Sequence, residues 1–368
     1  MSGLLVHEWV AKSGGSERVV DQMVAAFPDA DLKVLWNDDP GRFQVEPSET
    51  WLAGTPLRRH KAMALPFMPA TWNSLASAKT YEWMLVSSHL FAHHARVRGQ
   101  RELPKLVYAH TPARYVWAPD LDTRGQNPLA RVASTLLRPI DRARAQEATA
   151  IAANSQFTRD RIQSAWRRDA VVIYPPVDTE RISAVEDWAA LVGKQGREIL
   201  DGLPSEFLLG ASRFVPYKRL DLVIDAGVAA RLPVVLAGDG PAKGLLTARA
   251  ADAGVPVIFI DRPSDELLYA LYQRASAFVF PAVEDFGIMP VEAMAAGTPV
   301  IAPSTGGAAE SVAATGGGVI LHDESAEGWS QAVDQARRID RTTIAERSHR
   351  FSSAQFRHEI TSWVNAVV

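Results

Sequence analysis

Short apolar runs rich in β-branched and aromatic residues recur along this chain, and helix-like stretches separate most of them. Runs that are apolar throughout are typical of parallel strands buried on both faces of a sheet. The alternation therefore predicts an α/β protein with two doubly wound, Rossmann-like sheets. The expected strands are Leu4–His7, Asp31–Leu35, Glu82–Ser87, Lys105–His110, Ala148–Asn154 and Ala170–Tyr174, followed by Phe207–Ala211, Val234–Ala237, Val257–Ile260, Ala277–Phe280, Pro299–Ala302 and Gly318–Leu321.

A stiff turn, Tyr174-Pro175-Pro176-Val177-Asp178, follows the sixth expected strand, and no strand signal appears again before Glu206. We place the domain boundary there, with an N-terminal domain over residues 1–175 and a C-terminal domain over 176–352. Residues 353–368 are expected to form a separate helix. Ligands of such sheets bind beyond the carboxyl ends of the strands, so we expect the chemistry in a cleft between the two domains.

Composition narrows the class of protein. A chain of 368 residues that is 47% hydrophobic can bury substantial cores, and the absence of cysteine excludes disulfides and thiolate metal sites. The net charge of −3 lacks the basic excess of a nucleic-acid-binding protein, although the first 175 residues carry a net +5. No basic leader and no apolar run of membrane-spanning length is present. We therefore expect a soluble, cytoplasmic protein.

The segment Glu284–Glu292 sets two carboxylates on either side of a turn that opens a helix. Pro290 favours the first turn of that helix, where we also place Glu292, and Gly297 is expected to end it. A helix N-terminus can bind a pyrophosphate through its free N–H groups. We predict ribose contacts from Glu292 and a sugar contact from Glu284. The other predicted nucleotide contacts are Phe286, Gly287 and Ile288. Alternatively, both glutamates are ordinary solvated acids.

Arg213 and Lys218 lie on a loop between the seventh expected strand and the next helix. Arginine can bind two phosphate oxygens at once, and lysine supplies a compact positive charge. Together they can stabilise a departing nucleoside diphosphate without a metal ion. The alternative is a solvated basic loop.

Other strand-to-helix loops provide further candidates. Gly14 and Gly15 open an expected helix where backbone N–H groups can approach phosphate, and Gly238 and Asp239 form a comparable turn. Arg262 follows another strand, in a loop whose Ser264 is the expected helix N-cap. Each of these loops could equally be ordinary turn structure.

His110 stands at the carboxyl end of an expected strand, where ligands bind. It could contact the substrate there, although a lone histidine after a strand is usually structural. A metal site is not expected. The stretch Ser88–His94 is expected to be helical and holds histidines four apart, but it lacks the glutamate of zinc peptidases. Asp29-Ala30-Asp31 precedes its strand, which is the wrong end for a ligand loop.

The Glu284–Glu292 motif, followed by Ala-Met-Ala-Ala-Gly-Thr-Pro-Val, resembles the signature of glycosyltransferase family 4, whose members are retaining enzymes of the GT-B fold. The Arg213…Lys218 pair and the Gly14–Gly15 loop resemble the same family. The His-Thr-Pro sequence at His110, followed by Arg-Tyr-Val-Trp, is similar to a branch rich in mannosyltransferases.

This resemblance implies a metal-independent transferase without a cofactor, which moves a hexose from a nucleoside diphosphate sugar to an acceptor hydroxyl with retention. The implied catalytic residues are His110, Arg213, Lys218 and Glu284. GDP-mannose is the favoured donor, and a glycan or lipid-linked glycan is the favoured acceptor. The first domain would bind the acceptor, the second would bind the donor, and the terminal helix would cross back to the first domain.

Three alternatives remain open: a UDP-sugar-dependent enzyme of the same fold, a sugar-nucleotide epimerase, and a non-catalytic nucleotide-sugar sensor. A basic and apolar segment, residues 58–69, adds a question about partners. It is expected to be mobile, and it suits either peripheral contact with an anionic membrane surface or an ordinary loop.

Overall fold

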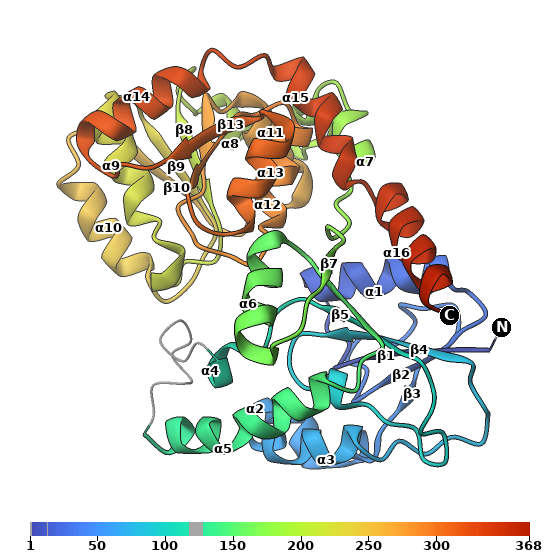
Figure 1. The fold of residues 1–368 in the computed structure, drawn as a ribbon. Coiled ribbons are helices and arrows are strands. Elements are labelled where there is room, and N and C mark those ends of the chain that lie inside the picture. Colours follow the sequence, from blue (N-terminus) through green and yellow to red (C-terminus); the bar gives the residue numbers. More distant parts are fainter. Residues whose placement is uncertain (1, 13, 118–127) are drawn as a thin grey trace. The chain divides into compact units, whose positions relative to one another are not determined.

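The computed structural model describes residues 2–12, 14–117 and 128–368. The chain divides into two compact units: unit 1 comprises Met1–Pro176 with Ser353–Val368, and unit 2 comprises Val177–Ser352. Each unit is built on one parallel sheet with helices against it (Figure 1). The predicted fold class, two doubly wound α/β units, is confirmed.

The sheet of unit 1 has the strand order β3-β2-β1-β4-β5-β6-β7. Leu5 of β1 lies opposite Leu32 of β2 on one side and Leu85 of β4 on the other. All six predicted strands are present, and the edge strand β3 is additional. The strands are β1 Gly3–His7, β2 Asp31–Val34, β3 Ser48–Glu49, β4 Trp83–Ser88, β5 Lys105–Ala109, β6 Ala150–Ala153 and β7 Val171–Val172.

Alternate strand residues of unit 1 enter different hydrophobic clusters. Leu5 contributes to a cluster with α1 and α16, whereas Val6 contributes to a cluster with α3 and α6. The sheet is therefore buried on both faces, as the apolar runs require. The helices described in this unit are α1 Gly15–Ala26, α2 Lys61–Ala64, α3 Met68–Trp72, α4 Arg114–Trp117, α5 Pro128–Ala145, α6 Gln156–Trp166 and α16 Ser353–Val367.

The terminal helix α16 belongs to unit 1 because it buries an apolar stripe there. Phe356, Ile360 and Val364 recur at helical spacing and are all buried. The ring of Phe356 meets that of Tyr108 at 5.7 Å, and the helix lies beside α1 (Figure 1).

The sheet of unit 2 has the order β10-β9-β8-β11-β12-β13, and all six of its strands were predicted. They are β8 Leu208–Ala211, β9 Val234–Ala237, β10 Val257–Ile260, β11 Ala277–Val279, β12 Val300–Pro303 and β13 Gly318–Leu321. The helices are α7 Thr179–Ser183, α8 Lys194–Asp201, α9 Asp221–Ala230, α10 Lys243–Ala251, α11 Asp265–Arg274, α12 Ile288–Ala295, α13 Gly307–Thr315, α14 Ala326–Ala336 and α15 Arg341–Ser348.

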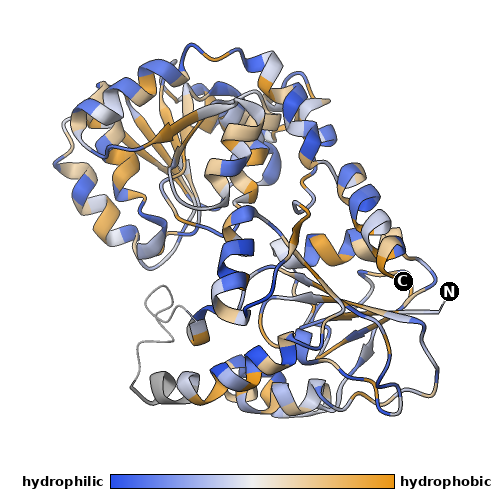
Figure 2. Cartoon of the chain, viewed as in Figure 1, coloured by the Kyte–Doolittle hydropathy of each residue, from blue (hydrophilic) through white to orange (hydrophobic). Residues whose placement is uncertain are grey.

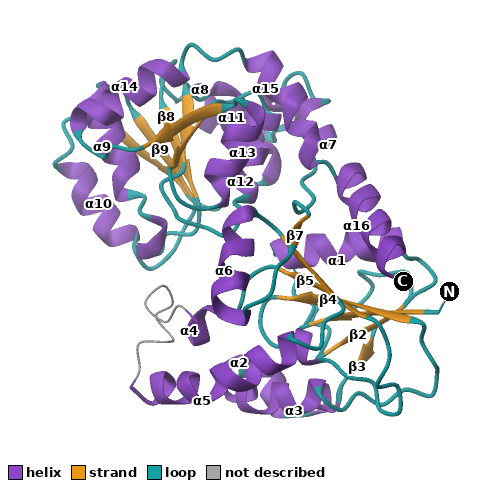
Figure 3. Ribbon diagram, viewed as in Figure 1, coloured by secondary structure: helices purple, strands orange, loops and turns teal. Residues whose placement is uncertain are grey.

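Helices cover the sheet of unit 2 as well (Figure 3). Residues of α9, α10 and α14 share one hydrophobic cluster with strand residues such as Leu208 and Val234. On α11, Tyr272 meets Phe278 of β11 at 5.1 Å between ring centroids. The strands are strongly hydrophobic, while the helices are mixed (Figure 2).

The expected helix over Ser88–His94 is wrong, and residues 58–69, for which an ordinary loop was one alternative, contain helical turns. Residues 58–69 are not a loop but a series of short turns of helix, which include α2 and two 3-10 helices, Pro56–Arg59 and Leu65–Phe67. Prolines at the helix starts explain the interruptions. The stretch Ser88–His94 is not one helix, because β4 continues to Ser88 and only Ala92–His94 forms a 3-10 turn.

Candidate active site

Five loops of unit 2 gather at the carboxyl edge of its sheet. They follow β8, β9, β10, β11 and β12, and they lead into α9, α10, α11, α12 and α13. Because neighbouring parallel strands end at one edge, these loops and the N-termini of their helices lie together. Their backbone N–H groups and helix dipoles make this edge suitable for an anionic ligand.

Lys218 and Glu284 meet at this edge. Lys218 ends the 3-10 helix Pro216–Lys218 and is only 7% exposed, and its Nζ forms an ion pair with Oε1 of Glu284. The strands before the two loops are neighbours, since Leu208 of β8 lies opposite Ala277 of β11. The ammonium also lies 5.7 Å from the ring centre of Phe280. The structure thus joins two predicted site residues, a pairing that the sequence did not indicate.

Arg213 and Arg219 flank Lys218 but differ from it in exposure. Both are exposed. Arg213 donates a hydrogen bond of 2.9 Å to the hydroxyl of Tyr217, whereas Arg219 pairs with Glu324 at 3.2 Å. Arg213 therefore remains on the predicted loop with Lys218, while Arg219 is engaged elsewhere.

Close backbone approach ties the loops after β8 and β9 together. A Cβ atom on Gly238, which has φ of +141°, would lie 1.8 Å from the carbonyl oxygen of Ser212. The N–H of Phe214 donates to the carbonyl of Asp239 at 2.8 Å. Only glycine fits at position 238, and the predicted glycine turn is therefore a contact between two loops.

Asp239 and Arg262 form an ion pair at 2.6 Å between the loops after β9 and β10. The hydrogen bond from Arg262, with one from the backbone of Gly240, lowers the pKa of Asp239. Arg262 has φ of +43°, and its exposed side chain points toward Asp239 because of this ion pair. Ser264 accepts a hydrogen bond from Leu267 N, as predicted for an N-cap.

The start of α13 holds the loop that carries Glu284. Gly307 N donates to Glu284 O at 2.9 Å, and a Cβ on Gly307 would lie 2.4 Å from the carbonyl oxygen of Asp285. Gly287 caps α12 in the left-handed region at φ of +87°, Phe286 is buried beside it, and Ile288 begins the helix. The backbone of the glutamate motif is thus fixed by its neighbours.

Glu292 is not in the first turn of its helix, so that part of the prediction is wrong. The helix α12 begins at Ile288, two residues before Pro290, and Glu292 is its fifth residue. Glu292 is buried. Gly297 has φ of +79° just beyond the helix, which agrees with the predicted helix end.

In unit 1, His110 follows β5 at the carboxyl edge of the sheet and is partly exposed. Its Nε2 lies 2.9 Å from the hydroxyl of Ser87, and that hydroxyl lies 3.1 Å from Nδ1 of His7. His7 and Ser87 are fully buried. The sequence did not indicate these two partners, because their contact depends on the order of the strands.

Gly14 caps α1 and Gly15 begins it, as predicted. Glu17, in the first turn, is buried, and its carboxylate accepts hydrogen bonds from Ala11 N at 3.2 Å and Ser16 Oγ at 2.8 Å. The start of this helix therefore already holds one carboxylate.

Sequence reasoning missed a buried carboxylate at the end of β1. Glu8 is fully buried and accepts hydrogen bonds from Leu90 N at 2.9 Å and Ala92 N at 2.6 Å. Trp72 Nε1 is a third donor, at 3.2 Å. Burial raises the pKa of Glu8 to about 7. The only signal in the sequence was its position: a charged residue, Glu8, directly follows an apolar strand and stands between His7 and Trp9.

Among the described residues, His93, His94 and Asp141 have the spacing of metal ligands, with ligand atoms within 4.8 Å of one another. However, Asp141 also accepts hydrogen bonds of 2.7 Å from the indole N–H groups of Trp117 and Trp166. The buried carboxylate is thus surrounded by N–H donors, which suits a structural anchor. In the sequence Asp29-Ala30-Asp31, where no metal site was expected, Asp31 begins β2 and forms an ion pair with Lys79.

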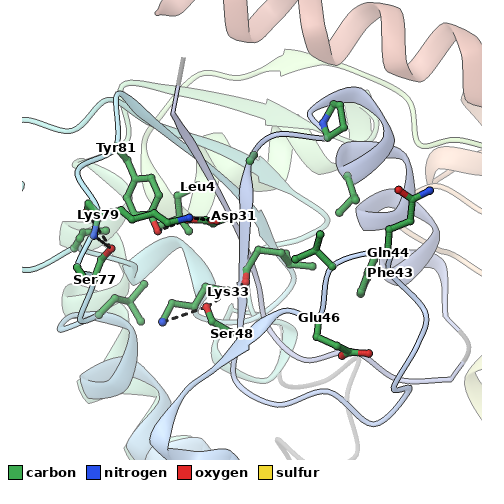
Figure 4. Close-up of a pocket in the computed structure, with 18 of the residues that line it drawn as sticks. Leu4, Asp31, Lys33, Phe43, Gln44, Glu46, Ser48, Ser77, Lys79 and Tyr81 are labelled. Carbon is green, nitrogen blue, oxygen red and sulfur yellow. Dashed lines mark hydrogen bonds and ion pairs between the residues drawn. The ribbon is translucent and has the colours of Figure 1, made fainter.

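A groove of about 880 Å³ lies at the opposite edge of the unit 1 sheet (Figure 4). Asp31 and Lys33 of β2, Ser48 of β3, and Tyr81 before β4 contribute to its lining. Asp31 and Ser48 begin their strands and Tyr81 precedes β4, whereas His110 follows the carboxyl end of β5.

Comparison with known proteins identifies the family. Residues 13–181 match the family model "Glycosyltransferase Family 4", and residues 199–356 match "Glycosyl transferases group 1". The chain belongs to this family of glycosyltransferases. The matches cover the sheet of unit 2, the sheet of unit 1 except β1, and the loops that carry Gly14, His110, Lys218 and Glu284.

Curated relatives match about half of this chain. A GDP-mannose-dependent alpha-(1-6)-phosphatidylinositol monomannoside mannosyltransferase of Mycobacterium tuberculosis is 34% identical over 49% of this chain and 50% of its own length. A D-inositol 3-phosphate glycosyltransferase of Corynebacterium aurimucosum is 30% identical over 49% of this chain and 46% of its own. The chain therefore spans about half the length of the relatives that it matches.

Solved structures share the fold over the whole chain. HepE of Anabaena in complex with UDP has a TM-score of 0.67 at 18% identity and 100% coverage of both chains. Sucrose-phosphate synthase of Thermosynechococcus elongatus has a TM-score of 0.70 at 15% identity and covers 100% and 99% of the two chains. Within the described part of the chain, no helix is both long and apolar enough to cross a membrane.

Proposed function

We propose that this glycosyltransferase transfers a hexose from a nucleoside diphosphate sugar to an acceptor hydroxyl, with retention of the anomeric configuration and without a metal ion. The observation that carries the proposal is the ion pair between the buried Lys218 and the partly exposed Glu284, among five helix-opening loops of unit 2. It combines a cation for phosphate, a carboxylate for sugar hydroxyls, and backbone N–H donors.

The roles of these residues follow from their chemistry. Lys218 and Arg213 would stabilise the negative charge that develops on the departing diphosphate, which is the task that a divalent ion performs in other enzymes. Glu284 would accept hydrogen bonds from the hydroxyls of the sugar. The Lys218–Glu284 contact would then be exchanged for contacts to the donor, so that neither charge is left without a partner.

Unit 1 would bind the acceptor and place His110 against the substrate. For retention we propose attack from the face that the leaving group occupies, with a leaving phosphate oxygen helping to remove the acceptor proton. Mannose from GDP-mannose is our first choice of donor, because several relatives are named as GDP-mannose-dependent mannosyltransferases. A UDP-hexose donor is the second choice.

We also propose a lipid-linked acceptor. Trp51, Met63 and Phe67 are 57%, 62% and 46% exposed, and Trp51 and Phe67 meet at 6.3 Å between ring centroids. The exposed cations Arg59 and Lys61 are in the same region. Apolar groups beside cations suit shallow insertion into an anionic membrane surface. Sedimentation with vesicles of neutral and anionic lipid tests whether this surface binds membranes. Binding should require the anionic lipid and should fall when Phe67 is replaced by serine.

A thermal-shift screen with GDP-, UDP- and ADP-sugars, with and without EDTA, tests the donor. Turnover on lipid-linked and soluble acceptors, with the anomeric configuration of the product read by NMR, tests the reaction. We expect stabilisation by GDP-mannose that EDTA does not reverse. Release of a free, altered nucleotide sugar without acceptor would favour an epimerase, and binding without turnover would favour a sensor. Dependence on manganese and on Asp29 would contradict metal independence.

A further inference from the structure

Three polar side chains form a hydrogen-bonded chain that leads from the core of unit 1 to its carboxyl edge. The hydroxyl of Ser87 contacts Nδ1 of His7 at 3.1 Å and Nε2 of His110 at 2.9 Å. These residues end β1, lie near the end of β4, and follow β5, and the three strands are neighbours. This series of hydrogen bonds runs from the fully buried His7 to the partly exposed His110.

The inner end of this chain decides the direction of its hydrogen bonds. Burial and the neighbouring His110 lower the pKa of His7 to about 3, so His7 is neutral at physiological pH. Within the described part of the chain, Nε2 of His7 is buried and has no hydrogen-bond partner. Buried N–H groups without an acceptor are rare and costly, so the proton of His7 belongs on Nδ1, where Ser87 can accept it.

The direction then passes from one residue to the next. Ser87 accepts from His7, and its own hydroxyl proton is donated to Nε2 of His110. A neutral His110 that accepts at Nε2 carries its proton on Nδ1. We propose that His7 and Ser87 are positioning residues that hold His110 as the Nδ1–H tautomer, so that His110 donates a hydrogen bond to a sugar or phosphate oxygen.

This assignment deepens the proposed function and rests on it. A phosphate oxygen can only accept, and a sugar hydroxyl can do both. Since Ser87 occupies Nε2, a ring contact with substrate falls to Nδ1. The opposite direction would give His7 a buried N–H without an acceptor and would present a lone pair of His110 to the ligand, which a phosphate could not use.

Paired variants separate positioning from simple packing. Ser87→Ala removes the link, and Ser87→Thr keeps the hydroxyl. His7→Leu removes the inner donor, and His7→Asn keeps an N–H near the place of Nδ1. The matched control is Ser88→Ala, since Ser88 is the next residue, is fully buried, and contacts Nδ1 of His93 at 3.2 Å instead.

Nitrogen-15 NMR of the ligand-free protein, with the His110 signals assigned from a His110→Gln variant, gives the tautomer directly. We expect a protonated Nδ1 in wild type and in Ser87→Thr, and mixed tautomers in Ser87→Ala. We expect kcat to fall about tenfold in Ser87→Ala and His7→Leu, the equivalent of one hydrogen bond, and to recover in Ser87→Thr and His7→Asn. Ser88→Ala should leave both readouts unchanged.

A protonated Nε2 on His110 in wild type would overturn the assignment. Equal losses of kcat in Ser87→Ala and Ser88→Ala would overturn the positioning role, and His7→Leu provides the same comparison if Ser87→Ala does not fold. The NMR measurement needs no substrate. A wild-type protein with the Nδ1–H tautomer but no nucleotide-sugar turnover would therefore contradict the proposed function alone.

Discussion

Replacement of Lys218 by methionine removes one buried cation while keeping most of the length of the side chain. A charge-assisted hydrogen bond to phosphate contributes about 1.5–3 kcal/mol, which corresponds to roughly a 10- to 100-fold change in Kd. Since Lys218 is only 7% exposed, water can replace little of that interaction. We therefore expect GDP or UDP to bind to Lys218→Met at least tenfold more weakly, measured by isothermal titration calorimetry.

The same substitution leaves Glu284 without its ion-pair partner. The Glu284 side chain is 22% exposed, so water compensates in part and we expect a loss of about 1 kcal/mol in the free energy of unfolding. Glu284→Gln in the Lys218→Met background should restore part of that stability but not the affinity for nucleoside diphosphate. Urea unfolding and calorimetry on the four proteins of this double-mutant cycle separate the two effects.

Arg219→Met is the matched control. Arg219 is the next cation along the chain, but it is exposed and pairs with Glu324. We expect its Kd for nucleoside diphosphate to stay within about twofold of wild type, because exposed pairs contribute little. Wild-type affinity in Lys218→Met, or an equal loss in Arg219→Met, would refute the assignment of the phosphate contact to the buried lysine.

Three other outcomes are expected. Below pH 6.5 the fold should lose about 1.4 kcal/mol per pH unit for each of His7 and His94, because burial lowers their pKa values to about 3 and about 4 and only the unfolded state binds the protons. Glu8 has the opposite effect, because its raised pKa of about 7 means that the folded state binds its proton more tightly than the unfolded state does. The stability that Glu8 contributes is complete below pH 4.5 and is lost as pH rises through 7. Glu8→Gln should therefore make the free energy of unfolding, measured by urea titration, fall more steeply as pH is lowered. Gly307→Ala should raise the donor KM at least tenfold by displacing the adjacent glutamate loop, whereas Gly244→Ala, whose Cβ would meet nothing within 4 Å, should not.

The predicted strands were found because burial on both faces leaves a continuous apolar run in the sequence. The edge strand β3 lacks that signal, since it has two residues, Ser48 and Glu49, and both are exposed. The start of α12 was predicted too late because Pro290 suits any of the first positions of a helix. Local patterns thus locate an element better than they locate its first residue.

The sequence could predict which loop carries each residue of the candidate site. Arg213, Lys218, Glu284 and the glycine turns all lie on strand-to-helix loops, where the sequence placed them. Contacts between loops were not predictable, because they depend on which strands are neighbours. The order β9-β8-β11 brings Lys218 to Glu284, and nothing in the spacing of the two residues, 66 apart, indicates that contact.

Under the proposed function, the Lys218–Glu284 pair would also link recognition of the two halves of the donor. A nucleoside diphosphate sugar can satisfy both charges, because its phosphate takes the ammonium and its sugar hydroxyls donate to the carboxylate. A nucleoside diphosphate alone would attract the ammonium but offers no hexose hydroxyls to Glu284, whose 22% exposed side chain is only partly compensated by water. After transfer, therefore, re-formation of the ion pair competes with the product for Lys218. The same contact that stabilises the ligand-free protein would favour the intact donor and help release of the spent nucleotide.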